Sequence, residues 1–428
     1  MKITFWGASG GEVTGSMHRL DNNKASVLLD CGSRLDKNQI PLPDRLKRNT
    51  NVNAVVLSHP HTDHVGDLPN FVEQGFKGGI FSVHPTKDIT AALLFQNEPR
   101  HRAESVMEKY KPTVDHNQRV EVAEGIYVTF IPAAHILGSS FTLIENNGLR
   151  ILFSGDVGNK NKKLFDFPET LPEADVLLLE STYGARELHP DFNNSLNDMY
   201  HSIDRTISRS GNFPISGFSI QRTQELLYHL NKGKYEGQLP DDLRIVLDAP
   251  LGEVVTDIYL HYREYFSDEI SSAFNMMGNP FAYTTHYDGK PCVILASSSI
   301  SGSEGKIVQH YINGLENPNN TFAFPSYRPP GSLADRLARG CDTVHLRGKS
   351  LEVKAEIYDP RGFSSHADAT QLFEIVKMVK PKIVFLVHGE NIPRIALKEK
   401  IRGSVGEVIL PGIAEEFDLE TVLSKRAA

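Results

Sequence analysis

Three histidines and an aspartate follow one short apolar run near the N-terminus. The segment VVLSHPHTDHVG, residues 55–66, places His59, His61, Asp63 and His64 directly after residues typical of a buried strand. Imidazole nitrogens and carboxylate oxygens are ligands that suit Zn²⁺. The chain turns sharply at the end of a strand, so the first two histidines can point to one side and the other two residues to a second position. The spacing predicts two neighbouring metal ions rather than a solvated, histidine-rich loop.

Two metal ions need about seven or eight ligands, so this interpretation requires further ligands at the ends of other strands. His135 follows the apolar run Ile126–Ile131, and Asp156 follows the run Ile151–Phe153. Each residue alone is more typical of a structural role. Their order along the chain and their place after strand-like runs support the metal site when they are taken together.

Three later segments also carry an acid or a histidine in a strand-end or small-residue context. Glu180 ends the run VLLLE, residues 176–180, and the segment GFSSHAD, residues 362–368, contains Ser364, Ser365 and His366. His388 follows the run IVFLV, residues 383–387.

These segments together resemble the metallo-β-lactamase superfamily and, through the three later ones, its β-CASP branch of nucleases. The resemblance spans nearly the whole chain. It is most similar in arrangement to compact prokaryotic β-CASP ribonucleases, which are related to the endonuclease subunit of the eukaryotic pre-mRNA 3′-end cleavage factor. The implied fold class is α/β, an αββα sandwich with an inserted parallel α/β domain. The implied boundaries are 1–186 for the first part of the sandwich, 187–347 for the insertion and 348–428 for the completing part.

The resemblance also implies roles for the residues and a cofactor of two Zn²⁺ per chain. One metal ion would be held by His59, His61, His135 and Asp156, and the second by Asp63, His64, Asp156 and His388. Asp63 would accept a proton from a hydroxide-forming water between the metals. Glu180 would orient His366, which would face the scissile phosphate as proton donor or phosphate contact. Ser364 and Ser365 would bind phosphate oxygens.

The predicted activity is hydrolysis of phosphodiester bonds in single-stranded RNA, mainly endonucleolytic, with 5′ exonuclease activity left open. A His at position 388 resembles the RNA-directed members of the branch. The alternatives are a DNA nuclease of the same branch, a small-molecule hydrolase, and a non-catalytic RNA-processing scaffold. The segment GFSIQR, residues 217–222, departs from the family pattern, in which small residues precede this Arg. Further candidates for RNA contact are the basic run at residues 160–163 and, around Tyr327, the residues Arg328, Arg336 and Arg339.

Short β-branched runs predict the strands that must position these side chains. The first part of the chain has them at Lys2–Phe5, Ser26–Leu29, Ala54–Leu57, Gly79–Val83 and Ile126–Ile131. Phe141–Ile144 and Leu149–Phe153 flank ENNG, residues 145–148, which favours a tight antiparallel hairpin.

Beyond about Tyr183 the pattern changes to helices alternating with strands, which indicates a parallel α/β domain. A helix through Leu196 and Ile207 should stop at Gly211. The other predicted helices are Arg222–Leu230, Val254–Phe266 and Gly305–Tyr311, and the predicted strands are Arg244–Leu247, Val293–Leu295 and Thr321–Phe324. The last part should contain a strand Glu352–Tyr358, a helix Gln371–Val379, a strand Ile383–Val387 and a helix Ile392–Ile401.

Composition limits the remaining possibilities. The 428 residues suffice for two or three domains, and a net charge of -8 argues against a protein that coats nucleic acid, so RNA must be bound locally. Three distant cysteines indicate neither a disulfide framework nor a thiolate metal site. No apolar run approaches the roughly 18 residues that cross a bilayer. Strand-like sequence begins at Lys2, so we expect a cytoplasmic protein without signal peptide, membrane contact or the added RNA-binding domains of some relatives. The sequence is compatible with a homodimer.

Overall fold

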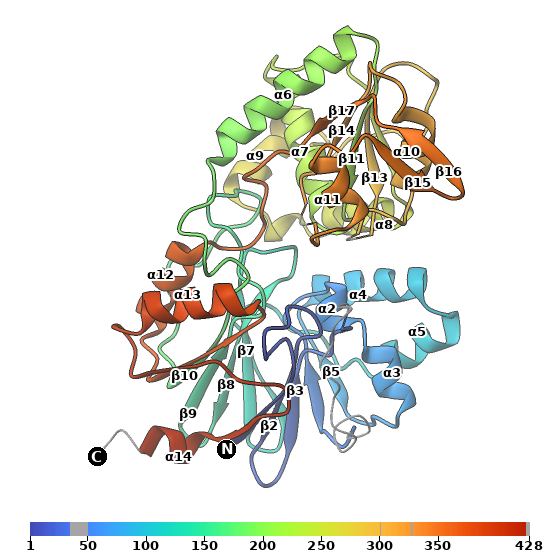
Figure 1. Cartoon of the computed structure of the whole chain (residues 1–428). Coiled ribbons are helices and arrows are strands. Elements are labelled where there is room, and N and C mark those ends of the chain that lie inside the picture. The colour runs from blue at the N-terminus through green and yellow to red at the C-terminus, as the bar shows by residue number, and fades with distance from the viewer. Residues whose placement is uncertain (35–49, 300, 327, 425–428) are drawn as a thin grey trace. The chain divides into compact units, whose positions relative to one another are not determined.

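The computed structural model describes residues 1–34, 50–299, 301–326 and 328–424, and its chain forms two compact units (Figure 1). Unit 1 comprises Met1–Leu188 and Ser365–Ala428, and unit 2 comprises His189–Ser364. The expected insertion therefore appears as a separate unit between two segments of unit 1. Among the described residues, no helix is both long and apolar enough to cross a membrane.

Unit 1 contains two sheets. The first has the strand order β20-β1-β2-β3-β4-β5, and the second has the order β19-β18-β10-β9-β8-β7-β6. The strands of the first sheet are β1 (Lys2–Gly7), β2 (Met17–Asp21), β3 (Ser26–Leu29), β4 (Ala54–Val56), β5 (Gly79–Phe81) and β20 (Glu416–Asp418). The strands of the second are β6 (Arg119–Ala123), β7 (Ile126–Pro132), β8 (Ser140–Asn146), β9 (Leu149–Phe153), β10 (Val176–Glu180), β18 (Ile383–Val387) and β19 (Glu407–Ile409).

The two sheets pack face to face around one apolar core. This core joins Val27 and Val56 from the first sheet to Phe130 and Phe385 from the second. A second core lies on the other face of the second sheet, where Leu177 of β10 packs with residues of the helices α12 (Ala369–Val379) and α13 (Asn391–Ile401). Figure 1 shows α3 (Leu68–Glu73), α4 (His84–Asn97) and α5 (Arg100–Met107) beyond the β5 edge. The predicted αββα sandwich and α/β class are confirmed.

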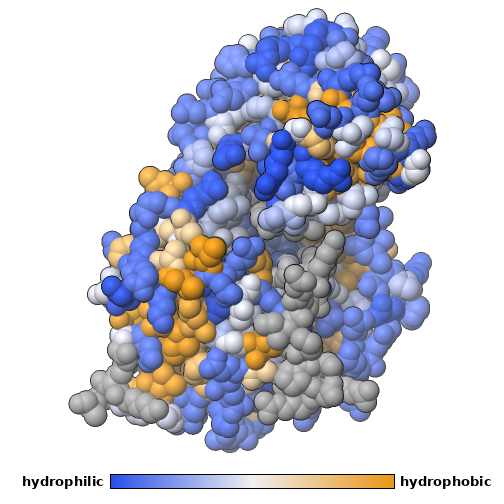
Figure 2. Space-filling model, in the orientation of Figure 1, coloured by the Kyte–Doolittle hydropathy of each residue, from blue (hydrophilic) through white to orange (hydrophobic). Residues whose placement is uncertain are grey.

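Helix α13 also carries apolar side chains that stay in solvent. Figure 2 shows a mainly hydrophilic face on which hydrophobic side chains gather near this helix. Ile392 and Ile395 are 75% and 53% exposed, whereas Leu397 and Ile401 are fully buried. Only one side of α13 therefore contributes to the core.

Unit 2 is built on a parallel sheet with the order β12-β13-β11-β14-β17. Its strands are β11 (Phe213–Gly217), β12 (Ile245–Asp248), β13 (Val293–Ser297), β14 (Thr321–Ala323) and β17 (Glu356–Tyr358). Its main helices are α6 (Phe192–Ser208), α7 (Arg222–Tyr235), α8 (Pro250–His261), α9 (Asp268–Met277), α10 (Ile307–Gly314) and α11 (Leu333–Ala338). The predicted parallel α/β domain is confirmed.

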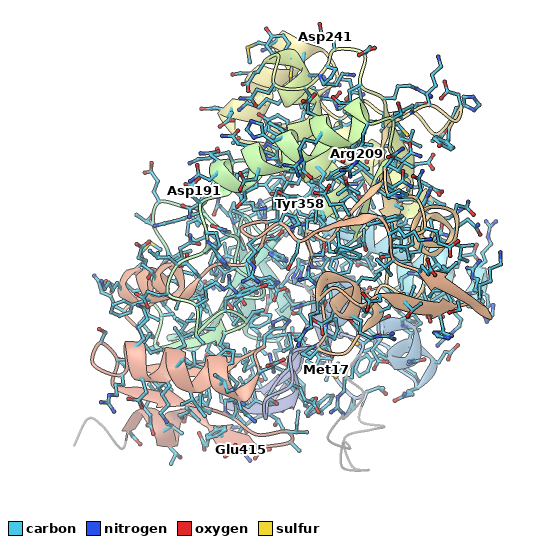
Figure 3. All side chains as sticks on the ribbon, turned by 45° about the horizontal axis from the view of Figure 1, so that its top comes forward. Met17, Asp191, Arg209, Asp241, Tyr358 and Glu415 are labelled. Carbon is cyan, nitrogen blue, oxygen red and sulfur yellow. The ribbon has the colours of Figure 1, made fainter. Side chains whose placement is uncertain are left out.

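Local chemistry explains where these elements start and stop. Figure 3 shows Asp191 and Arg209 at opposite ends of α6, and the Asp191 carboxylate caps the helix by accepting a hydrogen bond from the Asn194 N–H (2.8 Å). The residue that takes the left-handed conformation after α6 is Ser210, with φ 61°, and not the predicted Gly211. Gly211 is required for a different reason, because a Cβ there would lie 1.8 Å from the Asn319 carbonyl oxygen. The predicted hairpin is confirmed, with Asn147 and Gly148 at positive φ between β8 and β9.

Several predicted bounds are wrong. The helix expected at Val254–Phe266 begins earlier, because Pro250 suits a first helical turn, and it ends at His261. The helix expected from Gly305 begins at Ile307, because Gly305 has φ 94°.

The predicted strand Glu352–Tyr358 is two strands in two sheets. Its start belongs to β16 (Lys349–Glu352), which forms an unpredicted hairpin with β15 (Thr343–Leu346), and its end is β17. The break arises because the N–H groups of Lys354 and Ala355 both donate to the Leu315 carbonyl. Since β17 pairs with β14, the boundary expected at residue 347 is also too early.

Candidate metal centre

The seven side chains predicted as metal ligands lie in two groups in unit 1. The strands β4, β7, β9 and β18 end next to these groups, and the short helix α2 (Thr62–Val65) carries two of the residues. One group consists of His59, His61, His135 and Asp156, and the other of Asp63, His64 and His388. Within each group, one ligating atom per residue lies within 4.8 Å of the others. Strand ends that meet at one edge therefore bring together residues 329 positions apart, from 59 to 388.

The first group is a cluster of three imidazoles around one carboxylate oxygen. Asp156 Oδ2 lies 3.4 Å from His59 Nε2 and 3.5 Å from His135 Nε2. His61 Nδ1 lies 3.1 Å from His59 Nε2 and 3.3 Å from His135 Nε2. These four atoms face a common point, as the ligands of a tetrahedral metal ion do.

The second group lies around the other oxygen of the same carboxylate. Asp156 Oδ1 is 3.3 Å from His64 Nε2 and 3.5 Å from His388 Nε2. Asp63 Oδ2 lies 3.4 Å from His388 Nε2 and 3.9 Å from His64 Nε2. Asp156 thus offers one oxygen to each group.

The donor set fits divalent cations. Asp156 is only 2% exposed, and its Oδ1 has no hydrogen-bond partner among the described residues. A buried carboxylate oxygen without a hydrogen bond is costly unless a positive charge satisfies it. Nitrogen and oxygen atoms without any thiolate are the ligands that borderline and hard divalent ions prefer.

Burial and neighbouring charge set the protonation of these ligands. Burial lowers the pKa of His59 and His135, and it lowers the pKa of His61 to about 3, so these imidazoles keep a free lone pair. Burial opposes ionisation of Asp156, but the surrounding histidines hold its pKa well below its ordinary value. Burial would lower the pKa of His64, but nearby carboxylates, above all Asp156, outweigh it and raise this pKa. The same negative field attracts a cation, whose binding would release a proton.

The outer ring nitrogens of four histidines are held by other groups. The Nδ1–H of His64 donates to Asp30 Oδ2 (2.7 Å), and the Nδ1–H of His135 donates to the Ser365 carbonyl (3.2 Å). His388 Nδ1 lies 3.1 Å from Thr182 Oγ1, and His59 Nδ1 lies 3.1 Å from Ser58 Oγ. These contacts fix the ring orientations and direct the inner nitrogens toward the centre.

Asp30 is a functional residue that the sequence analysis missed. It is fully buried and accepts further hydrogen bonds from the hydroxyls of Ser16 (3.0 Å) and Ser58 (3.0 Å) and from the Ser58 N–H (2.8 Å). Its backbone has φ 59°, a conformation that Asp tolerates better than most residues. The available signal was its position directly after the apolar strand β3, because several of the predicted metal ligands also follow strands directly.

His366 and Glu180 form a separate pair beside the first group. His366 Nδ1 lies 3.1 Å from Glu180 Oε1, and His366 Nε2 lies 3.9 Å from Asp156 Oδ2. Glu180 is fully buried and also accepts hydrogen bonds from the N–H groups of Val157 (2.8 Å) and Thr182 (3.2 Å). Burial opposes a charge on His366, but Glu180 and Asp156 outweigh it and raise its pKa to about 9.

The remaining predicted residues are only partly brought to this site. Ser365 reaches it through its carbonyl, while Ser364 is the last residue of unit 2. Lys160 forms an ion pair with Glu374, and Arg328 forms a two-pronged ion pair with Asp359 at 2.8 Å. Tyr327 lies outside the described residues.

The sequence matches models of three protein domains. The Beta-lactamase superfamily domain matches residues 25–208, the Beta-Casp domain matches residues 223–337, and the Zn-dependent metallo-hydrolase RNA specificity domain matches residues 350–411. The chain belongs to the β-CASP branch of the metallo-β-lactamase superfamily. It is thus a metal-dependent hydrolase of a nuclease family, as the motifs predicted.

Named relatives support the same assignment. A ribonuclease from Thermus thermophilus is 31% identical, with 97% of this chain and 99% of the relative covered. Cleavage and polyadenylation specificity factor subunit 3 from Dictyostelium discoideum is 27% identical, with 89% of this chain and 52% of the relative covered. A protein of unknown function from Enterococcus faecalis has a crystal structure with a TM-score of 0.61 and 16% identity, covering 97% of this chain and 99% of its own, and so shares the fold.

Proposed function

We propose that the protein is a zinc-dependent ribonuclease that hydrolyses phosphodiester bonds of single-stranded RNA, mostly by internal cleavage. The observation that carries this proposal is the position of the Asp156 carboxylate. It presents one oxygen to each of two groups of side chains that could each hold a metal ion. Two metals a few ångströms apart are common in enzymes that cleave phosphodiesters. The ribonuclease from Thermus thermophilus, similar over almost the full length of both chains, supports RNA as the substrate.

The metal ligands would be the two groups already described, with Asp156 common to both. Bound dications would supply Lewis acidity and positive charge against the phosphate, which the net charge of -8 does not provide.

The chain's own groups would move the protons. Asp63, whose carboxylate faces His388, would accept a proton from the attacking water. The Nε2–H of His366 would donate a proton to the departing 3′ oxygen, since its other nitrogen is held by Glu180. Glu180 would keep His366 protonated and correctly oriented. Hydrolysis would leave a 5′ phosphate on the downstream fragment.

Two of the three alternative functions are less well supported than a nuclease. A non-catalytic scaffold has no need of clustered metal-binding side chains, and the two groups of histidine and aspartate side chains support a catalytic site instead. A small-molecule hydrolase needs neither the inserted unit 2 nor the His366–Glu180 pair. A DNA nuclease would use the same metal chemistry, so only a comparison of RNA and DNA cleavage distinguishes it from a ribonuclease.

The test uses single-stranded RNA and DNA of one sequence, labelled in turn at the 5′ and 3′ ends. Purified protein is incubated with each, with and without chelator. We expect internal RNA cuts that chelator abolishes and that added Zn²⁺ restores. Cleavage of RNA that persists in chelator, or no cleavage of any nucleic acid by zinc-loaded protein, would contradict the proposal.

A further inference from the structure

A small hollow lies at the carboxyl edge of the parallel sheet of unit 2. The chain leaves β11 toward β12 on one side, and it leaves the neighbouring strand β13 toward β14 on the other side. Adjacent strands with connections in opposite directions leave a crevice at their carboxyl ends, where α/β proteins bind ligands. The hollow is lined by residues at or directly after the ends of β11, β13 and β14, three strands that are neighbours in the sheet.

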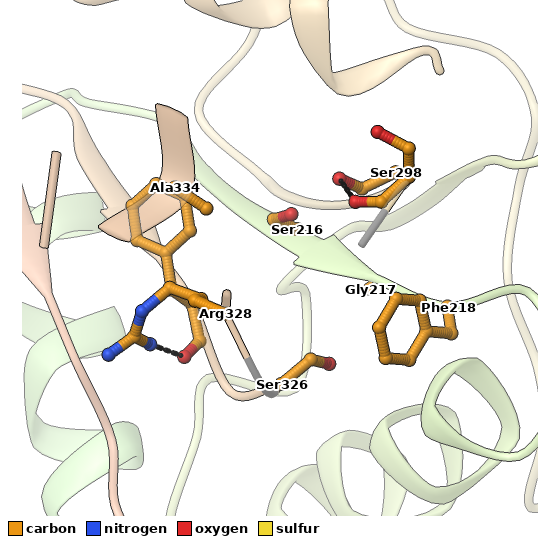
Figure 4. A pocket seen from close by; sticks show the side chains of 9 residues that line it. Ser216, Gly217, Phe218, Ser298, Ser326, Arg328 and Ala334 are labelled. Atoms are coloured by element: carbon orange, nitrogen blue, oxygen red, sulfur yellow. Dashed lines mark hydrogen bonds between the residues drawn. The ribbon is translucent and has the colours of Figure 1, made fainter. Parts of the chain in front are cut away.

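The lining favours a ligand that accepts hydrogen bonds. Figure 4 shows hydroxyl groups around the hollow, with Arg328 on one side and the ring of Phe218 on another. The hydroxyls come from Ser216, Ser298, Ser299 and Ser326. Among the described residues that line it, none is an acid. Hydroxyls and a guanidinium N–H are hydrogen-bond donors that suit the oxygens of an anion such as phosphate, although Asp359, outside the lining, balances the charge of Arg328.

Two of these groups have unused donors. In the described part of unit 2, Ser326 Oγ and Arg328 Nε are buried and have no hydrogen-bond partner. The rest of the Arg328 head is held in place, because it donates to both oxygens of Asp359 and to the Phe324 carbonyl (2.8 Å each). Leaving buried donors unpaired costs free energy, which a ligand oxygen would recover.

Described residues beside the hollow, from Ser297 to Gly305 with residue 300 left out, have local contacts of their own. Ser299 Oγ accepts a hydrogen bond from the Glu304 N–H (3.2 Å) and lies 3.0 Å from Ser301 Oγ. Gly305 has φ 94°, and a Cβ there would lie 2.4 Å from the Ser297 carbonyl oxygen. Residues held in this way lose little conformational entropy when a ligand binds next to them.

We propose that this hollow binds a phosphate group of the RNA backbone, one other than the phosphate that is cleaved. This inference rests on the proposed function, because it takes RNA as the substrate. The Ser326 Oγ and Arg328 Nε donors would bind the phosphate oxygens. The Ser298 hydroxyl, which donates to the Ser299 carbonyl (2.9 Å), would turn to them, and a base next to that phosphate would stack on Phe218. Aromatic rings beside backbone contacts are usual in proteins that bind single strands.

The experiment measures RNA affinity in the full chain carrying His366→Ala, so that the RNA stays intact. A single-stranded oligoribonucleotide is made in a series in which one phosphate at a time is replaced by a neutral methylphosphonate. We expect one internal replacement to weaken binding on the order of tenfold. In Ser298→Ala/Ser326→Ala protein, affinity for the unmodified RNA should fall by a similar factor, and that replacement should then have no further effect.

A charge variant and a matched control make the test specific. Ser326→Asp places a negative charge in the hollow and should weaken RNA binding at least as much. Ser272→Asp adds the same charge to an exposed residue of α9 that does not line the hollow, and it should have little effect. Thermal melting confirms that each variant is folded. If the exposed control weakens binding as much as Ser326→Asp, the hollow is not the contact and the proposal is overturned.

Further outcomes separate this proposal from the ribonuclease assignment. A flat methylphosphonate series in a protein that cleaves RNA would overturn the proposal and leave the function intact. A position-specific effect that the double variant removes, in a protein whose wild type cuts nothing, would support the site and contradict the function. Tight binding of inorganic phosphate that the double variant abolishes, together with a flat series, would assign the hollow to free phosphate and overturn the backbone assignment.

Discussion

At the scale of single residues, the molecule depends most on Asp156. Its two oxygens face two sets of histidines, and the side chain is only 2% exposed. The histidines around it are in turn held by Asp30, Thr182 and a backbone carbonyl. A change at Asp156 should therefore affect both groups, whereas a change at an outer residue should affect one.

Asp156→Ala should lower zinc content at both positions and abolish cleavage. The reason is that its carboxylate presents one oxygen to each group of side chains. Elemental analysis of purified protein measures the loss. Asp198→Ala, at an exposed position on α6, removes the same group and should retain the wild-type zinc content. Near-normal zinc in Asp156→Ala protein would contradict the shared site.

His366→Ala should retain its metals and its RNA affinity and lose turnover on the order of 100-fold or more. The imidazole pairs with Glu180 and is not a member of the two groups of proposed ligands, although His366, Glu180 and Asp156 also lie close enough together to hold an ion. Single-turnover cleavage rates and zinc content, measured on the same preparation, give the comparison. A loss of zinc in this variant would mean that His366 is a ligand.

His116 should make the fold less stable in acid. Burial lowers its pKa from 6.5 to about 4, and its Nε2 lies 3.0 Å from Ser140 Oγ. His116 binds a proton near pH 6.5 in the unfolded chain and only near pH 4 in the folded chain. Its contribution to the free energy of unfolding is therefore complete above pH 6.5 and is lost as the pH falls from 6.5 to 4.

The variant His116→Gln keeps a polar partner for Ser140 without this titration. In metal-free protein, its unfolding free energy should change less with pH between 6.5 and 4, by up to about 1.4 kcal/mol per pH unit. Urea denaturation across this range measures the slope. Equal slopes for the two proteins would exclude His116 as a source of acid sensitivity.

At the scale of elements, the ends of strands position the side chains of the candidate site, and one side of α13 packs against the second sheet that contains several of these strands. Leu397 lies in the core behind the second sheet, next to residues of β10 and β18, whereas Ile395 of the same helix is 53% exposed. We expect Leu397→Ala to reduce the unfolding free energy by about 2–5 kcal/mol and Ile395→Ala to change it by less than about 0.5 kcal/mol. Chemical denaturation compares the two variants, and similar losses would show that the packing of α13 is different.

Sequence patterns predicted the elements that have strong local signals. β3 and β18 have the predicted bounds, because each is a mainly apolar run closed by a polar residue. The break between β16 and β17 was not predictable, since it arises from hydrogen bonds to Leu315, a residue distant in sequence. Gln221 is a further case: it stands at φ 69°, where the family pattern has a small residue, and its side chain accepts a hydrogen bond from the Tyr259 hydroxyl (2.7 Å).

In the candidate site, too, residues with a strong local sequence signal were predicted, and residues whose role depends on distant contacts were not. The spacing from His59 to His64 has few other uses, so these ligands were evident from the sequence. Asp30 and Thr182 were not, because an acid or a threonine after a strand is common and only the fold shows which ring nitrogen it faces.

At the scale of the whole molecule, the chain leaves unit 1 after Leu188 and returns at Ser365. His388 belongs to the returning segment and completes the second group of ligands. As a ligand of the proposed second metal, it would not contact a ribose hydroxyl itself, so it should set the rate of cleavage and not the choice of nucleic acid.

His388→Ala should therefore weaken the second metal and slow cleavage without reversing a preference for RNA. We expect single-stranded RNA to be cut at least about tenfold faster than DNA of the same sequence, in the wild type and in the variant. Initial rates at matched salt and saturating Zn²⁺ measure both ratios. Equal or faster cleavage of DNA by the wild type would overturn the RNA assignment and leave the metal site unaffected.

The late position of His388 also has a consequence during translation. A ribosome synthesises the chain from its N-terminus, so the ligands from His59 to Asp156 emerge well before His366 and His388. In a nascent chain that has made only the first segment of unit 1, the proposed second metal position would be incomplete and the proposed proton donor absent. On the proposed function, the unfinished enzyme would therefore be inert toward the messenger RNA that encodes it, and it would become active only when synthesis has passed unit 2.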